Sequence, residues 1–459
     1  MATANTEHVL NMSEGKPLGL LLRFSLPVVV ANILQQLYNI ADTTIAGHML
    51  GEAALSQIGT TTALYALITN LAFGMNSGLA LAVSNAFGAQ NDREIKQSVA
   101  WMTTLAAACA VILTVLFVSL RYPLLRMLNT PSDLFAGAMD YLEVILIGIP
   151  VTMAYNLEGS LMQAVGNSRT PLILLLISSA LNIGLDYLFM GPLNMGVRGA
   201  AIATIIAQGV SAVFGNTFIW LHYPRLRFGR RDFKVKRGFV ADTLTTGVSM
   251  ALTSTIYNIG GVLLQSSING LGNAYITAQV AARRLVEVIY TPGGSLSLAV
   301  ATYSSQNLGA GKRSRIAQGA RVAAWVYAAW WVIAIVLTLT LGRSAVQLIT
   351  ASLDETVVGE AVRYLNINIP LIPPMAILVI LRNMLQGMQH RVAPLMCSVI
   401  EMAGKVIFAL WIVPVMGYTA VCICEPVMWV VCCIYLCIVM MRCKGELRDD
   451  YGVGETSAA

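Results

Sequence analysis

Long apolar runs separated by short charged turns constrain this chain more than any other feature of its sequence. Hydrophobic residues make up 56% of its 459 residues and charged residues only 11%, whereas a soluble domain carries about 25% charged residues. Only helices or closed β-barrels satisfy their backbone hydrogen bonds in lipid. The runs are much longer than the roughly ten-residue alternating strands of a barrel, so the sequence predicts an all-α polytopic membrane protein.

Twelve of these runs are long enough to cross a bilayer as helices, for which about 18 apolar residues suffice. The first run is too long for the apolar core of a cleavable signal peptide, and the residues before it are polar. We expect transmembrane helices over residues 18–46, 53–83, 96–120, 133–158, 168–190, 197–222, 239–269, 274–304, 317–342, 356–381, 391–414 and 417–441.

Basic residues are concentrated in the turns on one side of these helices. The connection after the sixth helix, RLRFGRRDFKVKR (225–237), carries seven bases against one acid. Basic loops stay in the cytoplasm, so we expect a cytoplasmic (inner) membrane protein with both termini in the cytoplasm. The net charge of +6 follows from these turns and implies no nucleic-acid partner. The basic connection either only orients the chain or also contacts lipid headgroups.

The two halves of the chain resemble each other. LAVSNAFGAQNDREIKQ (81–97) aligns with VATYSSQNLGAGKRSRIAQ (300–318), and equivalent positions lie about 221–223 residues apart. Six helices per half is an even number, so the halves form two six-helix lobes related by a pseudo-two-fold axis along the membrane normal. Such a pair of lobes suits a central cleft with alternating access.

This repeat also defines the expected domains. We expect a polar N-terminal tail, an N-lobe with helices 1–6, a basic cytoplasmic linker, a C-lobe with helices 7–12 and a cytoplasmic C-terminal tail, over residues 1–15, 16–222, 223–238, 239–441 and 442–459.

Polar residues inside the first-lobe helices form the sharpest candidate site, because ionisable groups in a membrane are costly and commonly functional. Asp42 lies near the outer end of the first helix, and Asn182 and Asp186 share one face of the fifth. Thr204 lies at a similar depth in the sixth. These oxygen donors could bind Na⁺ or share a proton. The alternative is two separate helix-end acids with local partners.

The second lobe does not copy this set. Its eighth helix carries Arg283 and Glu287, and its eleventh carries Glu401 and Lys405, each pair at i,i+4 spacing. These residues either pair along their own helices or present Glu287 or Glu401 to a cationic substrate.

Catalytic and cofactor motifs are absent from the sequence. It contains neither an ATP-binding GxxxxGK[ST] loop nor HExxH, and we expect no enzyme activity and no cofactor beyond the coupling ion. The eight cysteines, without CxxC spacing, are interpreted as packing residues rather than disulfides or metal ligands. The four histidines are not expected to cluster.

Several stretches together resemble the multidrug and toxic compound extrusion (MATE) family over about residues 16–441. They are NIADTTIAGH, VSNAFGAQN, LMQAVGNSRTP, LNIGLD and GVRGAAIATI, and VIYTPGGSLS resembles the bacterial MepA-like group. The resemblance implies an antiporter that exports cationic or amphiphilic drugs and toxic compounds in exchange for inward H⁺ or Na⁺. It also implies that Asp42, Asn182 and Asp186 carry the coupling ion, supported by Thr204. Some members have an acid on the seventh helix and another on the tenth. Here the stretch LTTGVSMALTSTIYNIGG of the seventh helix has no acid and the tenth helix lacks a central carboxylate, so coupling should depend on the first lobe.

We expect small organic substrates, a lipid environment and function as a monomer. A flippase for a lipid-linked precursor is the alternative transporter; a membrane-embedded enzyme and a receptor or scaffold fit the sequence less well. The expected substrate cleft contains Tyr38, Asn39, Met75, Tyr155, Asn156, Gln279, Arg283, Glu287 and Glu401.

Overall fold

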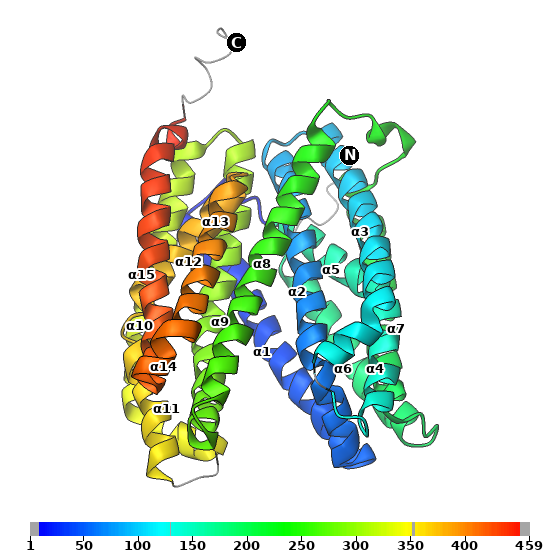
Figure 1. Ribbon diagram of the computed structural model, residues 1–459. Coiled ribbons are helices and arrows are strands. Elements are labelled where there is room, and N and C mark those ends of the chain that lie inside the picture. Colours follow the sequence, from blue (N-terminus) through cyan, green and yellow to red (C-terminus); the bar gives the residue numbers. More distant parts are fainter. Residues whose placement is uncertain (1–8, 129, 351–353, 450–459) are drawn as a thin grey trace. The chain divides into compact units, whose positions relative to one another are not determined.

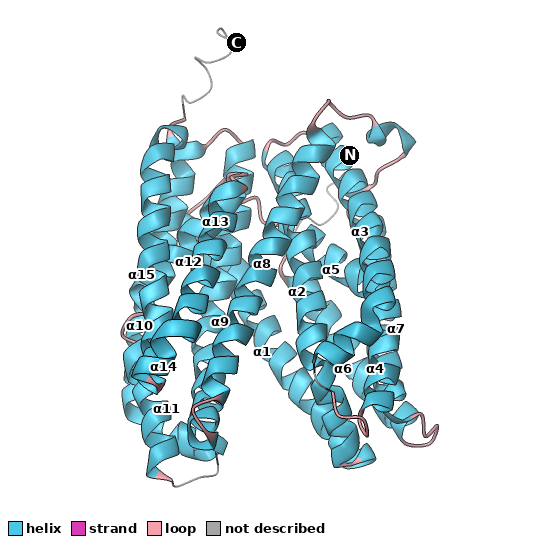
Figure 2. Ribbon diagram, in the orientation of Figure 1, coloured by secondary structure: helices cyan, strands magenta, loops and turns pink. Residues whose placement is uncertain are grey.

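The computed structural model describes residues 9–128, 130–350 and 354–449, and these ranges contain helices and loops without strands (Figures 1 and 2). The predicted all-helical fold class is confirmed. Parts of the predicted tails, residues 1–15 and 442–459, lie outside the described residues.

Ten helices in the described ranges are long and apolar enough to cross a membrane, and two bent pairs raise the number to as many as twelve. The predicted spans therefore all correspond to helices, although most helices extend beyond the apolar run. In chain order the elements are α1 (Pro17–Leu50), α2 (Glu52–Gly88), α3 (Asp92–Met127), α4 (Phe135–Ile147), α5 (Ile149–Ala164), α6 (Arg169–Met190), α7 (Gly196–His222), η1 (Pro224–Leu226), η2 (Arg230–Phe233), α8 (Phe239–Asn269), α9 (Asn273–Gly309), α10 (Arg313–Thr350), α11 (Glu355–Asn368), α12 (Ile372–Gly387), α13 (Val392–Ile407), η3 (Phe408–Ile412), α14 (Val413–Met416), α15 (Tyr418–Arg442) and η4 (Cys443–Leu447).

The fourth and tenth spans are broken rather than continuous, which corrects the prediction of single helices over residues 133–158 and 356–381. The chain bends by 50° between α4 and α5 and by 57° between α11 and α12. Proline lacks the N–H that a continuous helix needs, and Pro150 and Pro370 lie at the two breaks. Near the second break, the buried Asn368 amide donates to the carbonyl oxygens of Tyr364 and Cys422 at 2.9 and 3.1 Å.

Left-handed backbone positions recur with the spacing of the sequence repeat. Gly51 before α2 and Gly272 before α9 lie 221 residues apart and have φ angles of 82° and 109°, a conformation that glycine adopts without steric cost. The internal repeat is therefore visible in the backbone. Three further pairs have the same relation, namely Gln90 with Gly311, Gly166 with Gln389, and Gly196 with Gly417.

The described chain divides into two compact units. Unit 1 contains residues 9–10 and 27–251, and unit 2 contains residues 11–26 and 252–449. The boundary at residues 26 and 27 falls inside α1, and the boundary at residues 251 and 252 falls inside α8. The lobe boundaries predicted from the sequence stay a prediction.

The first half of α8 packs against α2 within unit 1 through small residues. A Cβ atom added to Gly78 would lie 2.7 Å from the Gly247 Cα, and one added to Gly74 would lie 2.9 Å from the Ala251 Cα. Small residues allow membrane helices to approach this closely. This contact explains why residues 239–251 belong to unit 1.

A cluster of apolar side chains from α1, α2, α4, α6 and α7 supports the candidate site in unit 1. It includes Ile45, Tyr141, Met190 and Ala200, all of which are buried. Three of them lie three or four residues from Asp42, Asp186 and Thr204 on their helices, so this packing fixes the helices that carry the polar groups.

Candidate functional site

Polar groups from three helices of unit 1 meet in one site. Asp42 comes from α1, Asn182 and Asp186 from α6, and Thr204 from α7. Asn182, Asp186 and Thr204 are buried, and Asp42 is partly buried. The four residues predicted from the sequence are thus brought together, mainly because α6 presents Asn182 and Asp186 one helical turn apart on the same face.

Asn182 links the three helices. When its amide nitrogen faces Asp186, it donates to Asp186 Oδ2 at 2.8 Å and to the Tyr38 hydroxyl at 3.2 Å, and its oxygen accepts from the Thr204 N–H at 3.1 Å. This orientation pairs donors with acceptors at both ends of the amide. The Thr204 hydroxyl donates to the Ala200 carbonyl oxygen at 3.1 Å.

Within the described residues, neither acid of the site forms an ion pair with a base. The carboxyl groups of Asp42 and Asp186 hydrogen bond to each other, which requires a proton on one of them because ionised carboxylates only accept. Oδ1 of each acid is buried and has no hydrogen-bond partner in the described part of the chain. Unpaired buried oxygens are costly, so the site is able to take a proton or a small cation.

Three polar residues that were not predicted from the sequence form a chain that begins at Tyr65, near Asp42. Tyr65 of α2 hydrogen bonds to Gln208 of α7, and Gln208 Oε1 accepts from the Thr152 hydroxyl of α5 at 2.7 Å. Gln208 follows Thr204 by one helical turn, and this spacing was the available signal. Tyr65 and Thr152 had no comparable signal, because their partners lie on other helices.

The other cleft residues predicted in unit 1 differ in exposure and in hydrogen-bond partners. Asn39 is exposed and accepts from Gln35 at 3.2 Å, whereas Met75 is 2% exposed and belongs to the hydrophobic core. Tyr155 is partly buried, and the Asn156 amide donates to the Thr152 carbonyl oxygen at 2.8 Å. Of the predicted cleft residues in this unit, Tyr38 hydrogen bonds within the acidic site.

Unit 2 contains a buried network of charges in place of such a site. Glu401 pairs with Arg382 at 3.0 Å and with Lys405 at 3.3 Å. Glu425 pairs with Arg283 at 2.7 Å and lies 3.9 Å from Lys405. The pair of Glu401 and Lys405 has the i,i+4 spacing read from the sequence. Arg283, in contrast, pairs with Glu425 of α15 rather than with Glu287 of its own helix.

Aromatic and amide groups surround this network. The Lys405 ammonium lies 4.2 Å from the centre of the Tyr257 ring, and the Tyr418 hydroxyl donates to Gln279 Oε1 at 2.8 Å. Glu287 differs from these residues because its side chain is exposed and forms no ion pair within the described ranges. It is therefore the predicted acid of unit 2 that is most available to a ligand.

Comparisons with known proteins agree with this architecture. The MatE family model matches residues 27–188 and 249–411, and the two matches begin 222 residues apart. "Probable multidrug resistance protein YpnP" of Bacillus subtilis is 26% identical over 319 residues, which cover 67% of this chain and 68% of that protein. "Multidrug export protein MepA" of Staphylococcus aureus is 21% identical and covers 58% of this chain and 59% of that protein.

Solved structures show the same fold. The structure titled "Outward-facing conformation of a multidrug resistance MATE family transporter of the MOP superfamily" superposes with a TM-score of 0.86 at 21% identity, over 97% of this chain and 99% of that chain. The family match covers both halves of the sequence, in agreement with the internal repeat seen in the helices. The chain belongs to the MatE family of multidrug and toxic compound extrusion transporters, which are multi-pass membrane proteins and not enzymes.

Proposed function

We propose that the protein is a secondary antiporter that exports cationic or amphiphilic organic compounds in exchange for inward H⁺ or Na⁺. The observation that carries this proposal is the hydrogen-bonded pair of Asp42 and Asp186, each with a buried oxygen that lacks a partner in the described ranges. A transporter needs a site whose occupancy changes during the cycle, and this pair gains stability when a cation or proton occupies it.

The donors of the site suit both candidate ions. Carboxylate, amide and hydroxyl oxygens are hard ligands, and Asp42, Asn182, Asp186 and Thr204 offer only such groups to a metal ion. A Na⁺ ion would be held by these oxygens once the Asn182 amide turns its oxygen toward the acids, whereas a proton would be shared by the two carboxyl groups.

Occupancy of the site is proposed to reposition α1. Tyr38 and Asp42 lie one turn apart on this helix and contact Asn182 and Asp186 of α6. Pro27 lies inside α1 and removes one backbone hydrogen bond, which lowers the resistance of the helix to bending. An ion that binds one arrangement of α1 more tightly shifts the equilibrium toward it. By linkage, substrate and ion then weaken each other's binding.

Substrate class is inferred from relatives and from Glu287. Several relatives are named as multidrug resistance or export proteins, and an exposed acid in the middle of α9 suits a cationic ligand. Replacement of Glu287 by glutamine should weaken binding of ethidium several-fold more than binding of a neutral compound. Equal loss for both would assign Glu287 a structural role instead.

The protein is proposed to lie in the cytoplasmic membrane as a monomer with both termini in the cytoplasm. The support is the basic connection at residues 225–237, because basic loops remain on the cytoplasmic side. Cysteine replacement of the exposed Arg230, followed by labelling with a membrane-impermeant thiol reagent, tests this orientation.

A flippase or exporter of anionic compounds is the second candidate. Three bases, Arg283, Arg382 and Lys405, outnumber the two acids in the network of unit 2, and one relative, from Shewanella oneidensis, is named "FAD transporter". In liposomes, preferential transport of FAD or of an anionic lipid precursor over ethidium would favour this candidate.

Transport in liposomes with an imposed gradient tests the antiport proposal. We expect ethidium to be transported when either a pH gradient or a Na⁺ gradient is imposed alone, but not when both are collapsed. Ethidium movement that ignores both gradients would contradict ion-coupled antiport.

A further inference from the structure

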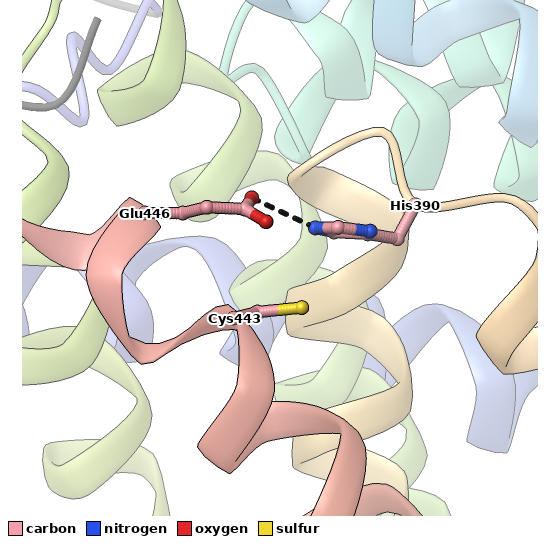
Figure 3. Close-up of side chains that lie close together, drawn as sticks. All are labelled: His390, Cys443 and Glu446. Atoms are coloured by element: carbon pink, nitrogen blue, oxygen red, sulfur yellow. Dashed lines mark hydrogen bonds and ion pairs between the residues drawn. The ribbon is translucent and has the colours of Figure 1, made fainter.

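Three side chains with metal-binding atoms converge beside the turn between α12 and α13 in unit 2. His390 belongs to this turn, while Cys443 and Glu446 lie in η4, which follows α15 (Figure 3). One ligand atom from each residue lies within 4.8 Å of the others, and all three residues are partly buried. We propose that His390, Cys443 and Glu446 bind a Zn²⁺ ion that fastens the C-terminal segment to this turn.

The distances approach those of a tetrahedral zinc site. His390 Nε2 lies 3.0 Å from Glu446 Oε2, and the Cys443 sulfur lies within 4.8 Å of a ligand atom of each of the other two residues. Bonds of about 2.0–2.3 Å to zinc place neighbouring ligand atoms about 3.3–3.8 Å apart. Small side-chain rotations therefore bring the three atoms onto one ion.

The backbone holds both sides of the site in place without the ion. The His390 N–H donates to the Leu385 carbonyl oxygen at 2.9 Å, which closes the turn after α12. The Glu446 carbonyl oxygen accepts from Arg313 at 3.3 Å. The Asp449 carboxylate accepts from both the N–H and the hydroxyl of Ser314 at 2.7 Å. Ligands held on ordered segments lose little freedom when the ion binds.

The donor set favours zinc over the ions of the proposed transport site. A thiolate, an imidazole and a carboxylate are typical zinc ligands, whereas Na⁺, Mg²⁺ and Ca²⁺ prefer oxygen alone. The thiolate and the carboxylate together balance the charge of Zn²⁺, and a water molecule completes four-coordination. This inference does not depend on the proposed transport function.

Cys443 distinguishes a zinc site from a simple ion pair. If only the contact between His390 and Glu446 mattered, the neighbouring thiol would be dispensable. A serine at position 443 keeps the size of the side chain but removes the thiolate ligand. Cys437, six residues earlier on the same segment and outside the three-residue cluster, provides the matched control.

The test is a zinc titration of the full-length protein in detergent after removal of any polyhistidine tag. Calorimetry should give one Zn²⁺ per chain, with affinity lowered more than about tenfold in Cys443→Ser and His390→Ala. Zinc should raise the Tm of wild type and Cys437→Ser but not of these two variants. Absence of stoichiometric binding, or equal affinity in Cys443→Ser, would overturn the proposal.

A measurement on the wild-type protein covers the case in which the variants do not fold. Zinc should slow the alkylation of Cys443 by N-ethylmaleimide, followed by peptide mass spectrometry, while Cys437 reacts at an unchanged rate. Equal rates at Cys443 with and without zinc would also overturn the proposal.

Discussion

The acidic site of unit 1 and the charge network of unit 2 occupy related positions in the repeat but differ in how their charges are satisfied. In unit 1, Asp42 and Asp186 hydrogen bond to each other and each retains a buried oxygen without a partner in the described ranges. In unit 2, Glu401 and Glu425 each pair with a base. Lys405 stands where the repeat places Asn182 in unit 1.

The difference separates a site that exchanges an ion from one that supports the fold. A carboxylate with a permanent basic partner gains nothing from a mobile cation, whereas an unbalanced pair does. The helix backbone differs as well: α6 is regular through Asp186, while its counterpart contains the π turn Phe408–Ile412 just before Pro414. Proline cannot donate to the preceding turn, which accounts for the irregular helix.

The largest expected effect is the loss of transport when either acid of unit 1 is neutralised. Asp186→Asn and Asp42→Asn should each abolish gradient-driven ethidium transport, to the level of protein-free liposomes, because neither variant retains the pair of carboxyl groups. Their thermal stability should remain close to that of wild type, since no ion pair is lost. Asp133→Asn, an exposed acid in the loop before α4, is the control and should transport normally. Normal transport by Asp186→Asn would refute the role of the pair.

The second prediction concerns the stability that the charge network gives to unit 2. Glu425→Gln should lower the free energy of unfolding by about 1–3 kcal/mol, because Arg283, whose side chain is 36% exposed, loses its carboxylate partner and Lys405 keeps only Glu401. Denaturant unfolding in micelles measures this change. Glu287→Gln, on an exposed position of α9, should leave stability nearly unchanged. Equal stability of both variants would show that the network is not structural.

A smaller effect is expected from the Thr204 hydroxyl, which lies in the acidic site. Thr204→Val keeps the shape of the side chain but removes the hydroxyl beside Asn182, and should weaken the coupling ion by about 1 kcal/mol, or roughly fivefold. The ion concentration at half-maximal transport measures this shift. Thr217→Val, an exposed threonine on α7 whose hydroxyl bonds to its own helix, is the control. Equal shifts in both variants would remove Thr204 from the site.

The smallest effect concerns an exposed ion pair in unit 2. Arg343 and Glu355 form a salt bridge with side chains that are 53% and 76% exposed. Solvent screens such a pair, so Glu355→Gln should change the free energy of unfolding by less than about 1 kcal/mol. A loss as large as that of Glu425→Gln would mean that burial does not explain the contrast between the two pairs.

Sequence patterns predicted most of the fold because the bilayer imposes a minimum length on each helix. The breaks after Ile147 and Asn368 were missed, since hydropathy records composition and not backbone direction. In the candidate site, Asp42, Asn182, Asp186 and Thr204 were found from depth and helical spacing. Tyr65 was missed because tertiary packing alone brings it near Asp42, whereas Gln208 was missed although it follows Thr204 by one helical turn.

Contacts between helices distant in sequence were likewise unpredictable. The spacing of Arg283 and Glu287 suggested a pair on one helix, but Glu425, on another helix, approaches Arg283 instead. The cysteines were expected to be packing residues and the histidines not to cluster, and no sequence pattern linked His390 with Cys443, which lies 53 residues later and beside it in the folded chain. Periodicity reports neighbours on one helix, and only the packed structure reports neighbours between helices.

Equilibrium substrate binding across pH and Na⁺ concentration measures whether the two acids of unit 1 bind the coupling ion. If Asp42 and Asp186 bind the coupling ion, ethidium affinity in wild type should fall as the concentration of H⁺ or Na⁺ rises, because substrate and ion weaken each other's binding. The same titration of Asp186→Asn should be flat, whereas Asp133→Asn should follow wild type. Wild-type affinity that ignores both ions, or full dependence retained in Asp186→Asn, would contradict the account.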